Sequence, residues 1–264
     1  MPELEGLKSE LKAKMLEQER TAALLAECEA RVTAANLALG RRVDEHTAEL
    51  KATNARLKEA LEQRDILLRE VYHRVKNNLQ IVDGLLALQS RQITDKDAVA
   101  ALRNVRQRVY AMGLVHQQLM KSADLKTFDV APFLRDLVKN VIDSGAYRGV
   151  NVSVQSIPLK VGLDFAIPLG LLVTELLTNS LKHAFPEGVG SVSIALGRGE
   201  HDKISLIVSD NGQTSESAQS PFAPKPGYGI NIITGLVSQL KGALVMENIN
   251  GARTEILLAA PVQS

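Results

Sequence analysis

The sequence predicts an α+β protein in which a long N-terminal helix leads into a helical hairpin and then into a domain with a mixed sheet. Residues 1–60 contain two glycines and one proline and are rich in Glu, Lys, Arg, Ala and Leu, which is typical of a long helix. Apolar residues recur three or four apart through about residue 121. Strand-like alternating runs appear after about residue 125. We therefore expect three parts, residues 1–60, 61–121 and 125–264.

Composition excludes several classes of protein. Lys and Arg total 31 against 30 Asp and Glu, and aromatic residues make up 3%, so nothing predicts a nucleic-acid or anionic-membrane partner. The single cysteine, Cys28, excludes an internal disulfide framework and a cysteine-based zinc site. The sequence has no apolar run of about 18 residues and no leader pattern, which predicts a cytoplasmic protein without a membrane span.

The N-terminal helix has the apolar spacing of a coiled coil. A four-residue step then shifts the phase, as a stutter does. The residues of this seam are Leu25, Cys28, Val32, Ala35, Leu39, Val43, Leu50 and Leu57. A single amphipathic helix lying on a globular body is the alternative. The wide charged face favours the coiled coil.

The first helix of the predicted hairpin carries a histidine on its polar side. One apolar stripe is predicted from Val71, Val75, Leu79, Val82 and Leu86. His73 lies two residues from both Val71 and Val75, which places it roughly 160–200° from the stripe, facing water. A histidine kept for packing would lie on the stripe. An ordinary surface histidine remains the alternative.

A turn at residues 94–97 separates this helix from a second one. The second apolar stripe consists of Leu102, Val105, Val109, Met112 and Leu119. Two antiparallel helices bury too little apolar surface alone, so we expect two chains to pair as a homodimer with a four-helix bundle. The upstream coiled coil would hold the pair together.

The third part alternates helices and strands irregularly. Helices are expected over residues 130–142, 164–184 and 230–240, and strands over 150–155, 191–196, 203–209 and 254–259. This order does not fit a doubly wound parallel sheet. It predicts helices on one face of a mixed sheet.

The helix over residues 164–184 has a polar face formed by Glu175, Asn179, Lys182 and His183 at helical spacing. A carboxylate, an amide, an ammonium and an imidazole in this arrangement could hold a divalent cation and a polyphosphate. An ordinary solvated helix face is the alternative.

The run "KISLIVSDNG" places Asp210 on the same strand face as Ile204, Leu206 and Val208. A carboxylate there needs a buried partner, such as the exocyclic amino group of a purine. A long loop over residues 213–226 then ends in "GYG", where Gly227 and Gly229 would let backbone amides approach phosphate before a helix. No P-loop motif is present.

Together these segments resemble the sensor histidine kinases whose phosphoacceptor helix reads like "EVYHRVKNNLQIV". "ELLTNSLKHAF" is similar to the N box of that family, and "DNG", "GYGINII" and "GARTEILL" are similar to its three glycine boxes. The resemblance covers about residues 64–260. It implies a dimerisation and phosphotransfer hairpin at 61–121, a Bergerat-type α/β sandwich that binds ATP at 125–264, and a signalling role for the coiled coil at 1–60.

The resemblance also implies roles for individual residues. His73 would be the phosphoacceptor, Glu175 would orient or deprotonate the nucleophile, and Asn179 would ligate Mg²⁺. Lys182 and His183 would approach the phosphates of ATP. The remaining roles belong to Asp210 at the adenine amino group, to Gly212, Gly227 and Gly229 in the lid, and to Thr254 at the adenine end.

The implied function is autophosphorylation from Mg-ATP followed by transfer to an aspartate of a response regulator receiver domain. Seven basic and three acidic residues lie from Arg74 to Arg108, a net charge of +4 that favours an acidic partner. The signal would come through the coiled coil or from an upstream sensor protein. A regulator dominated by phosphatase or relay activity, and a scaffold with a degenerate ATP domain, are the alternatives.

Three departures from the family pattern bear on this prediction. Tyr72 stands where close relatives often have a second histidine, which leaves His73 without an adjacent competitor. Gln213 and Thr214 follow Gly212, so the second glycine of the first box is missing. The missing glycine predicts weaker nucleotide binding, and a lid with a single GxG predicts slower phosphoryl transfer.

Overall fold

The computed structural model describes residues 2–143, 149–186, 188–212, 228–248 and 251–261. The chain divides into two compact units, Met1–Arg64 and Asp65–Ser264. Helix α1, Pro2–Gln92, belongs to both.

The first unit is the N-terminal part of α1. Its predicted seam residues, such as Leu25, Val32 and Leu50, are exposed in the single chain. The predicted long helix is confirmed. The pairing of two such helices stays a prediction.

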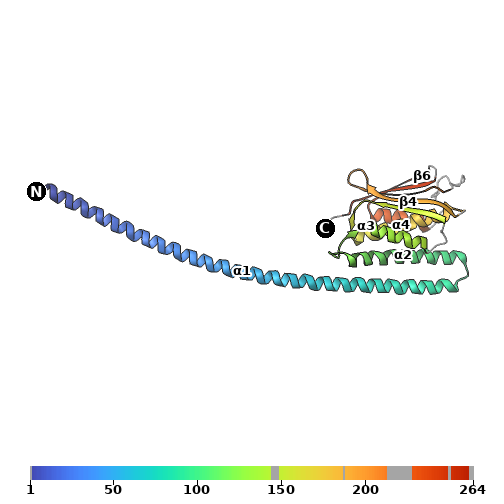
Figure 1. Cartoon of the computed structure of the whole chain (residues 1–264), viewed down its shortest axis with the longest axis horizontal. Coiled ribbons are helices and arrows are strands. Elements are labelled where there is room, and N and C mark those ends of the chain that lie inside the picture. The colour runs from blue at the N-terminus through green and yellow to red at the C-terminus, as the bar shows by residue number, and fades with distance from the viewer. Residues whose placement is uncertain (1, 144–148, 187, 213–227, 249–250, 262–264) are drawn as a thin grey trace. The chain divides into compact units, whose positions relative to one another are not determined.

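In the second unit, the last part of α1 and helix α2, Lys96–Lys121, form the predicted hairpin (Figure 1). The Asp95 side chain caps α2 by accepting a hydrogen bond from the Ala98 N–H at 2.7 Å. Arg106 of α2 donates to both carboxylate oxygens of Asp83 of α1, at 2.8 and 3.1 Å. These contacts fix the turn and the register of the two helices.

Two positions of the predicted apolar stripe on the first hairpin helix are exposed in the single chain. Val71 is 52% exposed and Val82 is 42% exposed, whereas Val75, Leu79 and Leu86 are half-buried. The reason is that α2 covers one side of α1, and the two valines lie on the adjoining side. Other exposed apolar residues on this part of the helix are Ile66, Leu67, Ile81, Leu85 and Leu88.

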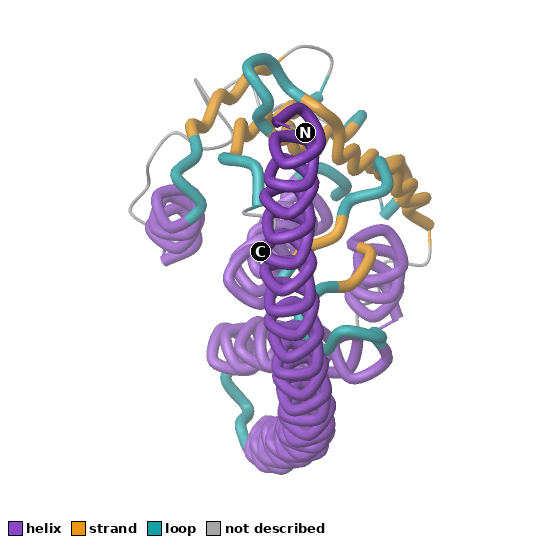
Figure 2. Tube along the Cα trace, turned by 90° about the vertical axis from the view of Figure 1, so that its left-hand side faces the viewer, coloured by secondary structure: helices purple, strands orange, loops and turns teal. Residues whose placement is uncertain are grey.

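The rest of the second unit is a five-stranded sheet with helices on one face (Figure 2). The helices are α3 (Val130–Asp143), α4 (Leu163–His183) and α5 (Tyr228–Gln239). The strand order is β2 (Gly149–Ser156), β4 (Val189–Arg198), β5 (Ile204–Asp210), β7 (Ala252–Leu258) and β6 (Ala243–Asn248). A further antiparallel pair joins β1 (Phe128–Asp129) to β3 (Lys160–Val161). Strands β2 and β4 are parallel and the other pairs of the larger sheet are antiparallel, so the predicted mixed sheet is confirmed.

Strand β6 was not predicted because its pattern is weak. Leu244 is half-buried, while Ala243, Val245 and Glu247 are exposed at the edge of the sheet. The short run "ALVMEN" therefore lacks the clean alternation that marks the other strands.

The core lies between the sheet and the helices, with α4 next to both α3 and α5. Leu134, Leu169, Leu172, Leu206 and Ile256 are fully buried there. Because neighbours cover α4 on several sides, few of its positions are left for polar groups.

None of the helices in the described residues is long and apolar enough to cross a membrane.

Candidate functional site

His73 lies exposed on α1, as predicted from its position relative to the apolar residues. Its neighbour Tyr72 fixes this turn of the helix: the Tyr72 hydroxyl donates to the Leu125 carbonyl at 3.3 Å. The Tyr72 ring also packs on His116 of α2, with ring centroids 5.7 Å apart. Burial lowers the pKa of His116. The tyrosine faces the protein and the adjacent histidine faces solvent.

The polar face of α4 packs against α2. The Glu175 carboxylate is 8% exposed and accepts a hydrogen bond from the Arg108 Nε at 2.6 Å. One turn later the Thr178 hydroxyl donates to the Gln107 Oε1 at 3.3 Å. The face predicted to meet Mg²⁺ and phosphate is thus in contact with the hairpin at these residues.

Lys182 continues the same face, and its Nζ donates to the Asn104 Oδ1 of α2 at 2.9 Å. The pKa of Lys182 is lowered, first by desolvation and then by the charges of Arg103 and Arg108, while Glu175 opposes the shift. The charges of Arg103 and Arg108 thus act on Lys182 together with that of a single carboxylate, Glu175. Such an excess of positive charge would attract phosphate. His183 is exposed at the end of the helix.

A second group of predicted residues meets at the end of β5. The Asp210 Oδ1 accepts hydrogen bonds from the backbone N–H groups of Gly212 and Ala252, both at 3.2 Å. Thr254 of β7 is 3% exposed and pairs in register with Val208 of β5. Because alternate residues share a strand face, Thr254 and Asp210 lie on the same side of the sheet. The structure thus brings these two predicted adenine-side residues together.

Two glycines shape this end of the sheet. A methyl group on Gly212 would overlap the Ala184 carbonyl oxygen at the end of α4. Gly251 has φ of +120°, and a methyl group there would overlap the Asp210 carbonyl oxygen. Gly251 was not predicted as a site residue, although it opens the run "GARTEILL". The close approach of Gly251 to the Asp210 carbonyl oxygen cannot be inferred from the local sequence of either residue.

The predicted lid is described only in part. The loop over residues 213–226 and Gly227 lie outside the described residues. Gly229 is the second residue of α5, at the helix N-terminus where it was expected.

The donor set fits a magnesium ion that arrives with a nucleotide. In the described ranges, no group of three or more His, Cys, Asp or Glu residues could hold a metal ion. Proteins commonly hold Mg²⁺ through one or two side chains together with substrate phosphates. Asn179, one turn after Glu175 on α4, offers an amide oxygen for such a site.

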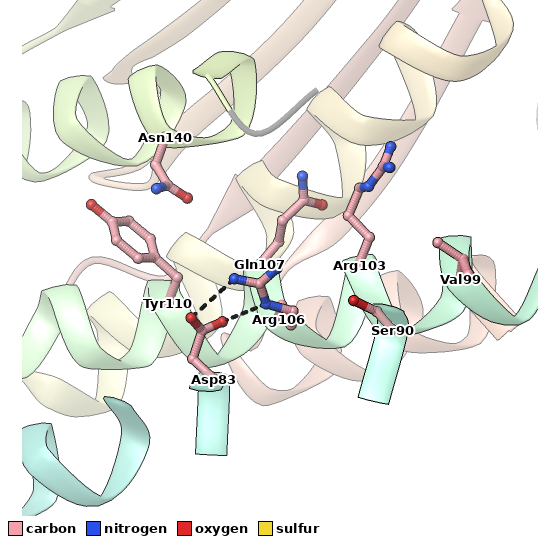
Figure 3. Close-up of a pocket in the computed structure, with 8 residues that line it drawn as sticks. All are labelled: Asp83, Ser90, Val99, Arg103, Arg106, Gln107, Tyr110 and Asn140. Carbon is pink, nitrogen blue, oxygen red and sulfur yellow. Dashed lines mark hydrogen bonds and ion pairs between the residues drawn. The ribbon is translucent and has the colours of Figure 1, made fainter. Parts of the chain in front are cut away.

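A separate cavity of about 270 Å³ is lined by residues of α1, α2 and α3 (Figure 3). Its lining includes Asp83, Arg106, Tyr110 and Asn140, and none of the predicted site residues. Arg103 also lines it, and its side chain points away from the Asp83–Arg106 pair (Figure 3). The cavity is therefore distinct from the predicted nucleotide site.

Two family models match successive parts of the second unit. Residues 70–145 match the model described as histidine kinase. Residues 165–264 match the model described as histidine kinase-, DNA gyrase B-, and HSP90-like ATPase. His73 lies in the first match, and the residues of α4, β5 and β7 discussed above lie in the second.

Individual relatives agree with these matches. The chain is 31% identical over 212 residues to sensor histidine kinase PdtaS of Mycolicibacterium smegmatis, covering 77% of this chain and 41% of that protein. It is 29% identical over 156 residues to blue-light-activated histidine kinase 2 of Erythrobacter litoralis, covering 56% and 44%. The chain thus spans about two fifths of the length of these curated relatives.

Among solved structures, the histidine kinase domain of the Erythrobacter litoralis EL346 blue-light activated histidine kinase is similar, with a TM-score of 0.53 and 26% identity. The similarity covers 74% of this chain and 92% of that domain.

Proposed function

We propose that this chain, which belongs to the sensor histidine kinase family, phosphorylates its own His73 from ATP and then passes the phosphoryl group to an aspartate of a response regulator receiver domain. The observation that carries the proposal is the exposed histidine on a helical hairpin, in a unit that also holds the Asp210 and Thr254 pair and the polar face of α4. In this proposal residues 1–60 transmit the input signal, residues 61–121 accept the phosphoryl group, and residues 125–264 bind ATP.

The proposed reaction is a phosphoryl transfer. The bond between the γ-phosphorus and the bridging oxygen breaks, a bond to an imidazole nitrogen of His73 forms, and ADP leaves. The imidazole proton passes to a base, for which Glu175 is the candidate once its carboxylate is free. Positioning and neutralisation of charge dominate this chemistry.

The nucleotide would lie between α4 and the β5–β7 end of the sheet. Asp210 would accept a hydrogen bond from the adenine amino group, supported by Thr254, and Gly212 and Gly229 would allow close approach of the backbone. Lys182 and His183 would contact the phosphates. Asn179 would hold Mg²⁺, which when bound neutralises charge on the phosphates.

The proposal is tested by incubating the whole chain with labelled ATP and magnesium. The expected results are stable incorporation of label, no incorporation when EDTA is present from the start, and transfer of the label to a receiver domain. Weak incorporation with rapid loss of phosphate from the receiver domain would instead indicate a phosphatase or relay. Undetectable Mg-ATP binding by calorimetry would indicate a scaffold.

The surface of the hairpin favours a receiver domain as partner. The residues between Arg74 and Arg108 carry a net charge of +4, and although Arg108 is paired with Glu175, the remaining positive charge would complement the acidic pocket in which such domains carry their aspartate. Exposure of His73 leaves the imidazole accessible to that pocket. The input would come from an upstream sensor through the N-terminal helix.

A homodimer is proposed from the exposed apolar side of α1. We predict that replacing Leu85 and Leu88 together by glutamate weakens self-association at least about tenfold, because both side chains are exposed in the single chain and would be buried between two. Light scattering after gel filtration over a concentration series measures the change. Replacement of the exposed polar residues Gln80 and Gln89 by glutamate is the control. A wild-type chain that is monomeric at every concentration would contradict the homodimer.

A further inference from the structure

Tyr72 contacts the junction at residues 122–127, which leads from α2 into the ATP-binding domain, and it directly precedes His73. We propose that Tyr72 is a positioning residue for the phosphorylation of His73. It fixes the direction in which His73 points and holds the start of the ATP-binding domain beside it. The inference rests on the proposed function, since it concerns the same transfer reaction.

The first support is the way in which Tyr72 enters the core. Among the described hydrophobic side chains that are partly buried against the core of the second unit, Tyr72 is the one contributed by α1. Its ring packs on His116 of α2, with ring centroids 5.7 Å apart and an angle of 49° between the ring planes. A large aromatic side chain packed in this way resists rotation of the helix about its own axis.

Rotation of this turn of α1 decides where His73 points. Successive residues of an α-helix are about 100° apart around the axis. A Tyr72 ring directed into the core therefore places His73 to one side of the contact, where its side chain is exposed. Group transfer is sensitive to such placement, because a shift of about 1 Å can lower a rate about a hundredfold.

The second support is the attachment of the junction to the same turn of α1. The Tyr72 hydroxyl donates to the Leu125 carbonyl at 3.3 Å. One turn earlier, the Arg69 Nη1 donates to the Met120 carbonyl at 3.1 Å. Met120 belongs to the last turn of α2, and Leu125 belongs to the junction. Two side chains within about one turn of His73 therefore hold the entry to the ATP-binding domain.

The third support is the rigidity of the junction. The Asp124 carboxylate accepts hydrogen bonds from the backbone N–H groups of Thr127 and Lys126, both at 2.9 Å, and from the Thr127 hydroxyl at 2.7 Å. These bonds lower the pKa of Asp124. Leu125 is 1% exposed and has φ of +55°, a left-handed conformation that a leucine keeps only where its surroundings hold it. A rigid junction carries the position that Tyr72 sets directly to β1.

An anchored junction raises the effective concentration of bound nucleotide at His73. The ATP-binding domain is tethered to the hairpin through this junction, so the rate of transfer depends on how often phosphate and imidazole are within reach. A junction released from Tyr72 moves more freely, and the phosphate spends less time in line with the imidazole. Nucleotide affinity stays unchanged, because the residues proposed to bind ATP lie on other elements.

The experiment measures kcat and KM for ATP in variants of the whole chain and, separately, the chemical phosphorylation of His73 by phosphoramidate. In the chemical reaction the P–N bond of phosphoramidate breaks, a bond from phosphorus to an imidazole nitrogen forms, and ammonia leaves. ATP takes no part in it. We expect Tyr72→Ala to lower kcat at least about tenfold, with KM and the rate of chemical phosphorylation within about twofold of the wild type.

Tyr72→Phe keeps the ring and removes the hydroxyl. It should recover most of the lost rate, with kcat about two- to fivefold below the wild type. It supplies the test if circular dichroism and thermal unfolding show that Tyr72→Ala does not fold. In both variants the amides of residues 122–127 should exchange hydrogen faster than in the wild type, which tests the anchor without reference to activity.

Tyr110→Ala and Tyr110→Phe are the matched controls, because Tyr110 is a tyrosine of α2 that is 38% exposed. We expect both to keep kcat and KM within about twofold of the wild type. A wild-type kcat in both Tyr72 variants would overturn the positioning role. An equal fall in labelling from ATP and from phosphoramidate would also overturn it, since the change would then lie in His73 itself.

A failure of the proposed function looks different. A wild-type chain that takes up phosphate on His73 from phosphoramidate but none from ATP would remove the kinase activity, and the role of Tyr72 with it. A wild-type chain that is labelled from ATP, with Tyr72 variants that keep its rate and its hydrogen exchange, would leave the kinase activity standing and remove only the role of Tyr72.

Discussion

Replacing His73 by alanine is expected to abolish the incorporation of acid-labile phosphate from ATP while leaving Mg-ATP affinity within about twofold of the wild type. The imidazole is exposed on α1, so its removal should change the free energy of unfolding by no more than about 0.5 kcal/mol. The loss of label would therefore reflect loss of the acceptor and not loss of the fold. The measurement is labelling with radioactive ATP followed by acid and alkali treatment.

His46→Ala is the matched control, because His46 is also an exposed histidine on α1. It should retain full labelling. Incorporation of acid-labile phosphate by the His73→Ala variant at the wild-type rate would remove His73 from the proposed role.

Replacing Asp210 by alanine is expected to weaken Mg-ATP binding by at least about tenfold. The change removes the proposed acceptor for the adenine amino group. It also leaves the backbone N–H groups of Gly212 and Ala252 without the carboxylate that they share. Losing a hydrogen bond to a charged carboxylate costs about 1.5–3 kcal/mol, and about 1.4 kcal/mol corresponds to a tenfold change in affinity.

Calorimetry with ATP measures the affinity of each variant. A second substitution separates the loss of the contact to the base from the loss of the backbone hydrogen bonds. Asp210→Asn keeps an acceptor for the backbone groups but changes the group that faces the base, so it should lose ATP affinity with a smaller loss of stability. Asp164→Asn, at the exposed start of α4, is the control and should bind ATP normally. Normal ATP affinity in Asp210→Ala would place the adenine elsewhere.

Much of the fold followed from local patterns in the sequence. The turn near Asp95, the exposed position of His73 and the alternation that places Asp210 with Val208 are set by residues close together in the chain. Helical and strand periodicity depend on such neighbours, and they were predicted correctly. The shared polar face of α4 was also predicted, since Glu175 and Lys182 both point toward one neighbour.

The identity of that neighbour could not be predicted. The pairing of Arg108 with Glu175 joins residues 67 positions apart, and nothing in either local pattern requires it. The exposure of Val71 and Val82 depends in the same way on which side of α1 the second hairpin helix covers. Gly251 was missed because its close approach to Asp210 brings two separate strands together.

The most direct test of the account is to locate the phosphoryl group in the labelled chain by mass spectrometry at neutral to alkaline pH. Trypsin cleaves after Arg69 and Arg74, which yields the peptide "EVYHR" with His73 as its one histidine. The account predicts that this peptide carries the phosphoryl group. Phosphate confined to peptides that contain His116 or His183, with "EVYHR" unmodified, would contradict it.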